Sequence, residues 1–122
     1  MKKRIKNRWI KALKSGEYVQ GKDRLYNPED NTYCCLGVLC KLYAKDKKKG
    51  LQKVINMPGS DEGAVLPSAV AKWAGIEGEL DIYNSPNVIT STRQVELVTL
   101  NDHDNLTFEE IADILKIGTV VL

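Results

Sequence analysis

Several features that mark common protein classes are missing from this sequence. No apolar run approaches the roughly 20 residues that a membrane-spanning helix needs, and none of signal-peptide length follows the charged residues 2–8. We therefore expect a chain that is neither inserted in a membrane nor secreted. There is also no glycine-rich phosphate loop and no evident pair of catalytic carboxylates. These absences favour a binding protein over an enzyme.

Cysteine and histidine are scarce, with three cysteines and one histidine. Cys34, Cys35 and Cys40 contain no Cys-x-x-Cys pair, whereas a zinc site needs about four ligands. Their odd number and close spacing predict a reducing cytoplasm, and packing in the core is the favoured interpretation. A Cys34 or Cys40 thiolate with His103 as its base would instead make the protein an enzyme. We expect no metal and no cofactor.

Charge is unevenly distributed along the chain. Residues 1–59 hold 15 of the 18 basic residues and 5 of the 16 acidic ones, whereas residues 60–122 hold 3 basic and 11 acidic residues. The basic half could therefore meet an anion. Alternatively, the two halves attract each other, either within one fold or between the subunits of a homo-oligomer.

The length of 122 residues and the 43% hydrophobic content predict a single domain with its own core. Apolar residues recur at helical spacing over residues 2–15, 34–47, 67–74, 92–100 and 107–117. Short strands are expected near residues 24–26, 33, 54–57, 64–66 and 119–122. Thr107 and Glu110 have the spacing of a helix capping box. The prediction is an α+β domain, with four to five short helices and a small antiparallel sheet or hairpins.

Polar and aromatic side chains gather in the segment after the first helix. They are Gln20, Lys22, Arg24 and Tyr26. Cations attract phosphate, and aromatic faces stack on bases. We therefore predict that this segment binds an anionic, nucleotide-like ligand, with Asn101 as a polar partner. The alternative is a solvated basic surface.

The acidic region that begins at residue 102 suggests two other functions. An EF-hand loop starting at Asp102 would need Gly at its sixth position and Glu at its twelfth, where this chain has Thr107 and Asp113. Residues 106–118 resemble the first helix and turn of a helix-turn-helix, but no recognition helix follows. Acidic residues also oppose phosphate binding. We expect neither calcium nor DNA at this element.

Several short motifs occur in a distinctive order along most of the chain. They are residues 8–13 (RWIKAL), 15–18 (SGEY), 20–21 (QG), 34–40 (CCLGVLC), 66–67 (LP), 73–75 (WAG), 100–102 (LND) and 107–113 (TFEEIAD). In this order the motifs resemble those of a group of small phage and prophage proteins. The resemblance implies no particular catalytic residues.

The resemblance implies an accessory protein in the cytoplasm of an infected or lysogenic bacterial host. Such proteins commonly act on host machinery or host defence. The first hypothesis is therefore a non-enzymatic sponge that sequesters a nucleotide immune signal. The alternatives are a protein–protein inhibitor or adaptor of a host protein, and the thiol-dependent enzyme.

Overall fold

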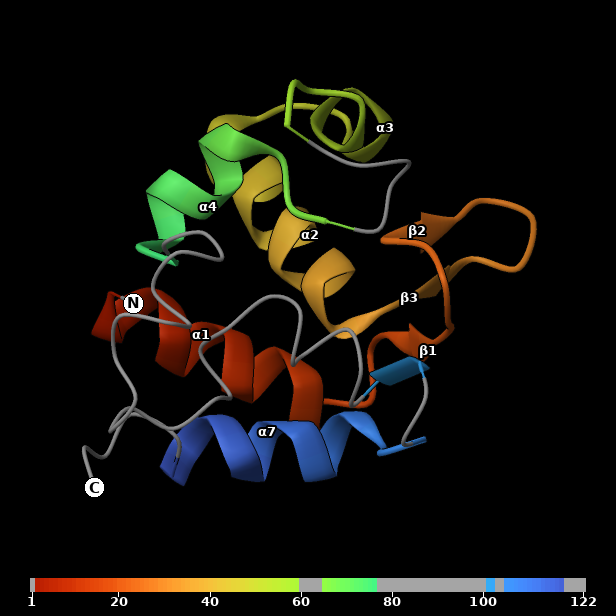
Figure 1. The fold of residues 1–122 in the computed structure, drawn as a ribbon, viewed down its shortest axis with the longest axis vertical. Helices are drawn as coiled ribbons and strands as arrows, with labels where there is room; N and C mark the ends of the chain where they lie inside the picture. The colour runs from red at the N-terminus through yellow and green to blue at the C-terminus, as the bar shows by residue number, and fades with distance from the viewer. Residues whose placement is uncertain (1, 60–64, 77–100, 103–104, 118–122) are drawn as a thin grey trace.

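The computed structural model describes residues 2–59, 65–76, 101–102 and 105–117. This part of the chain contains five helices and a small sheet, and Figure 1 shows how they are arranged. The helices are α1 (Lys3–Lys14), α2 (Cys35–Lys47), α3 (Leu51–Ile55), α4 (Ser68–Ala74) and α7 (Phe108–Ile117). The strands are β1 (Val19–Gln20), β2 (Tyr26–Asn27) and β3 (Thr32–Tyr33). The predicted α+β class is confirmed.

Helix α2 is the centre of the core. Its first ten residues, Cys35 to Ala44, are buried apart from the partly exposed Lys41. The chain before β2 crosses this helix so closely that a Cβ atom at Gly37 would overlap the carbonyl oxygen of Leu25. From the other side, the indole Nε1–H of Trp9 on α1 donates to the Cys35 carbonyl at 2.9 Å.

Helix α1 lies between α2 and α7. Figure 1 shows α1 and α7 side by side and running in opposite directions, and these two helices share the most extensive helix contact in the described fold. Lys14 on α1 forms an ion pair with Asp113 on α7 at 2.7 Å. The basic and acidic halves of the sequence thus meet within one chain, as one of the alternatives from the charge distribution predicted.

The sheet has the strand order β1-β3-β2. β2 pairs antiparallel with β3, as expected for the hairpin around residues 24–33. β1 pairs parallel with β3, with Gln20 opposite Tyr33, so the small sheet is mixed and includes the expected hairpin. β2 lies in the segment of chain between β1 and β3. This segment is long enough for β3 to lie beside β1 and run in the same direction.

Two predicted strands fall on residues that the structure describes as something else. Residues 54–57 were expected to be a strand, but α3 covers Leu51–Ile55 and Asn56 follows in a turn. Leu66 is buried outside any strand. The helix expected over 92–100 and the strand expected over 119–122 lie outside the described residues. None of the described helices is both long enough and apolar enough to cross a membrane.

Candidate functional site

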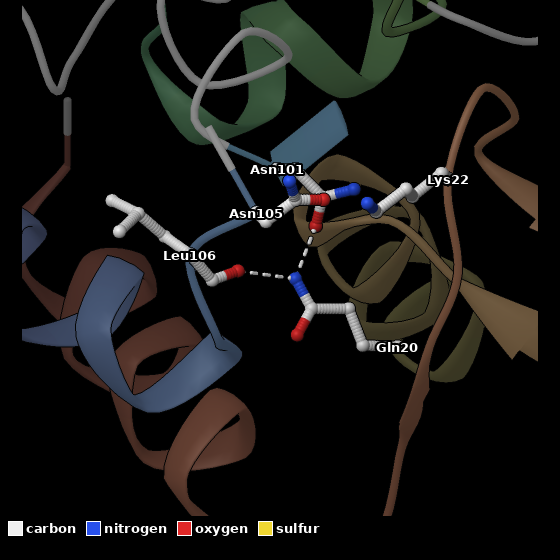
Figure 2. Close-up of a pocket in the computed structure, with 5 residues that line it drawn as sticks. All are labelled: Gln20, Lys22, Asn101, Asn105 and Leu106. Carbon is white, nitrogen blue, oxygen red and sulfur yellow. Dashed lines mark hydrogen bonds between the residues drawn. The ribbon is translucent and has the colours of Figure 1, made fainter. Parts of the chain in front are cut away.

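The side-chain amide of Gln20 joins β1 to the start of α7. Its Nε2 donates to Asn101 Oδ1 at 2.9 Å and to the Leu106 carbonyl at 2.7 Å, bonds that Figure 2 shows as dashed lines. Its Oε1 accepts the backbone N–H of Phe108 at 3.0 Å. That N–H belongs to the first turn of α7 and has no partner inside the helix. Gln20 therefore provides a hydrogen-bond acceptor for the N-terminal turn of α7, which lies far away in the sequence.

Asn101 is fully buried beside Gln20. Its Nδ2 donates to the Gly21 carbonyl at 2.8 Å and to the Asp102 carboxylate at 2.7 Å. Both hydrogens of each amide group are thus used, and each amide oxygen has a donor. A buried amide with all its hydrogen bonds made holds the backbone in place at little net cost. Gln20 and Asn101 thus form a rigid floor for a pocket between β1 and the start of α7.

The predicted capping box at the start of α7 is confirmed. Thr107 N–H donates to Glu110 Oε1 at 3.0 Å, and Glu110 N–H donates to Thr107 Oγ1 at 3.1 Å. Two residues before this cap, Asn105 has a positive φ of 56°, a conformation that asparagine tolerates better than most residues. The cap and this left-handed residue set the backbone from which the Asn105 side chain projects.

A pocket of about 300 Å³ opens above the floor, lined by Gln20, Lys22, Asn101, Asn105 and Leu106. Figure 2 shows the Lys22 side chain extending toward Asn101 and Asn105. Lys22 is exposed and forms no ion pair with any residue that the structure describes. The pocket thus combines one cation, amide groups and an apolar side chain. Its volume is near the lower end of the range for ligand pockets, about 300–1,000 Å³.

Three of the five predicted binding residues line this pocket, namely Gln20, Lys22 and Asn101. Arg24 and Tyr26 are not among its lining residues. Arg24 is exposed, and the Tyr26 ring packs against Tyr33 with its centroid at 4.8 Å. The Tyr26 hydroxyl donates to Asn31 Oδ1 at 2.9 Å.

Two lining residues, Asn105 and Leu106, were missed in the sequence analysis. The signal was present, because they immediately precede the capping box at Thr107. A helix N-terminus fixed by such a box also fixes the residues leading into it. The local sequence gives no sign that the loop with Asn105 and Leu106 pairs with β1, which lies more than 80 residues earlier.

The three cysteines lie in the core, and none forms a disulfide among the described residues. Burial raises the pKa of Cys34 to about 12. Burial also raises the pKa values of Cys35 and Cys40 well above the usual range. A thiol attacks as its thiolate, so these environments favour the packing interpretation. His103 lies outside the described residues, and no group of potential metal ligands occurs in the part of the chain that is described.

The fold and the pocket together define a small α+β domain with a single-lysine polar pocket at a helix N-terminus. The chain belongs to the family described as "Domain of unknown function (DUF8296)", whose model matches residues 1–119. Comparisons with curated proteins and with solved structures found no match.

Proposed function

We propose that this protein binds a small anionic, nucleotide-like ligand without transforming it, in the pocket beside Lys22. The observation that carries the proposal is the position of the Lys22 side chain. Its ammonium group has no ion pair within the described residues and extends over a floor of fixed amides. A cation that stands beside a preformed pocket can bind a phosphate with little rearrangement of the pocket.

The floor limits which groups can contact a ligand directly. The amides of Gln20 and Asn101 already make their hydrogen bonds to the protein, so recognition falls to Lys22, Asn105 and Leu106. Lys22 would attract a phosphate, the Asn105 amide would bind a sugar or base edge, and Leu106 would cover an apolar face. With a volume of about 300 Å³, the pocket suits a phosphorylated sugar or mononucleotide moiety.

The proposed biological role rests on the resemblance in the order of sequence motifs. The resemblance to small phage and prophage proteins supports a sponge that removes a nucleotide immune signal from the host. Such a protein needs affinity and abundance, and it needs no catalytic group. The Asn105 amide and the single ammonium group of Lys22 suit that task, because they recognise a ligand by charge and hydrogen bonds.

Native mass spectrometry is the first test, on protein purified from cells that express nucleotide-based defence systems. A retained molecule of nucleotide mass supports the proposal and identifies the ligand. Titration calorimetry with cyclic nucleotides and ADP-ribose derivatives should then detect binding that Lys22→Ala and Asn105→Ala weaken. Lys72→Ala is the matched control, since Lys72 is an exposed lysine on α4.

Two results would contradict the proposal. One is an apo-protein spectrum that stays unchanged after this panel is added, which would favour a protein partner. The other is a bound nucleotide whose affinity is the same in Lys22→Ala as in Lys72→Ala. That second result would show that the protein binds a nucleotide but that the Lys22 pocket is not the binding site.

A further inference from the structure

A second basic region lies on α1 and α2, and it is separate from the Lys22 pocket. The last turn of α2 and the residues after it carry four exposed lysines: Lys45, Lys47, Lys48 and Lys49. Helix α1 adds the arginines Arg4 and Arg8 to this region, because α1 packs against α2. The region is therefore a product of the fold as well as of the lysine-rich sequence.

The contacts of Asp46 show that the two helices share this surface. Arg8 on α1 binds the Asp46 carboxylate through two hydrogen bonds, at 2.8 and 3.1 Å. These bonds, with the positive charges of Arg8, Arg4 and Lys47, hold the pKa of Asp46 below its usual value. Asp46 is already neutralised by Arg8, so Arg4 and the four lysines carry a net positive charge.

Tyrosine rings border the same surface. Lys45 Nζ donates to the Tyr18 hydroxyl at 3.2 Å and lies 5.8 Å from the centre of that ring. The Tyr18 ring in turn packs edge-on against Tyr33 at 5.2 Å, and Tyr26 packs against Tyr33 from β2. Tyr18 and Tyr26 are both partly exposed. The lysine cluster thus adjoins Tyr18 through Lys45, and Tyr18 and Tyr26 are two partly exposed rings that both pack on the buried Tyr33.

We propose that this α1–α2 surface, with its bordering tyrosines, binds the backbone of single-stranded nucleic acid. Lysine and arginine neutralise successive phosphates, and tyrosine rings accept unpaired bases by stacking. An anionic membrane is the less suitable partner, because Val19 is the one strongly exposed large hydrophobic residue in the described structure. Membrane-surface binding normally adds buried apolar side chains to the charge attraction.

The proposal does not depend on the Lys22 pocket, which uses different residues. It also differs from the helix-turn-helix comparison, because the surface belongs to α1 and α2 and not to the acidic α7. The expected partner is an unstructured strand, either RNA or DNA, bound without base-sequence preference. Affinity should come mainly from released counterions.

Fluorescence anisotropy with labelled oligo-U and oligo-dT tests the proposal. A length of about 20 nucleotides exceeds the usual site of about 4–16 nucleotides. Both strands should bind, and affinity should fall steeply between about 50 and 200 mM salt. Lys47→Gln/Lys48→Gln should weaken binding at least about tenfold at the lower salt and make the salt slope shallower by about 1.4.

The matched control is Lys72→Gln/Lys116→Gln, which removes the same charge from exposed lysines on α4 and α7. It should bind like the unmodified protein, and thermal melts should show both variants folded. Tighter binding of oligo-U than of oligo-dT would identify RNA as the source, and the reverse would identify DNA. The proposal is overturned by undetectable binding, by equal loss in both variants, by equally strong competition from polyglutamate, or by binding only to phosphatidylserine vesicles.

Discussion

Replacing Asn101 with alanine should strongly destabilise the fold, although this residue is polar and belongs to no hydrophobic cluster. The change removes three hydrogen bonds, to Gln20, Gly21 and Asp102. At about 1 kcal/mol each, the free energy of unfolding should fall by about 3 kcal/mol. For a chain of 122 residues, an unfolding entropy of about 2.1 cal/mol/K per residue converts this loss into a Tm lower by about 12 °C.

A double-mutant cycle tests whether Gln20 and Asn101 act as a unit. Gln20→Ala also removes three hydrogen bonds, and one of them is shared with Asn101. The double variant therefore loses five bonds, and its cost should be about 1 kcal/mol smaller than the sum of the two single costs. Urea denaturation followed by tryptophan fluorescence measures all three variants.

Asn7→Ala is the control, since it makes the same chemical change at an exposed position on α1 and should be nearly neutral. An Asn101→Ala cost below about 1 kcal/mol would refute the network, because that value is the contribution of a single hydrogen bond. Strict additivity in the cycle would refute the direct bond between the two amides.

Gly37→Ala should lower the free energy of unfolding by about 3 kcal/mol or more in urea denaturation, because the added methyl group would overlap the backbone carbonyl of Leu25. Gly50→Ala is the control, since it has open space around it, and it should lower this free energy by less than about 1 kcal/mol. A thiol reagent at pH 8 should leave Cys34 and the other two cysteines unmodified until urea is added, since burial raises their pKa values; native-state labelling would contradict this. The folded-state pKa of Asp46 is lowered by Arg8, so their pair stabilises the fold above about pH 4 and is lost as the pH falls through that lowered pKa. Asp46→Asn should therefore flatten the acid end of the stability–pH curve, at a neutral-pH cost of no more than about 0.5 kcal/mol for this partly exposed pair.

The elements with strong local signals were predictable from the sequence. The apolar stripes of α1 and α2 gave their positions to within about a residue at each end, and the Thr107–Glu110 capping box marked the start of α7. The strand predicted at Val54 and Ile55 was wrong, because β-branched residues favour strands and this segment is helical in the structure. There the helix is set by burial, which places both side chains in the core.

The candidate site was predictable only in part. Lys22 and Gln20 were recognisable as polar residues in a loop-rich segment, and Asn101 as a possible partner. Their mutual arrangement depends on hydrogen bonds between residues 81 positions apart, for which no local pattern exists. The parallel pairing of β1 with β3 is non-local in the same sense, since two-residue strands carry little signal of their own.

The contact between α1 and α7 has a consequence for how the chain folds during synthesis. Helix α1 is made first, but its neighbour α7 begins at Phe108, more than 90 residues later. At about 5–20 residues per second, α1 waits roughly 5 to 20 seconds for that neighbour. During this interval the part of its apolar stripe that packs on α7 lacks the cover of that helix, and the Gln20 amide has no partner from the far end of the chain. A ribosome-bound nascent chain halted before α7 should therefore remain a good chaperone substrate until that last helix emerges.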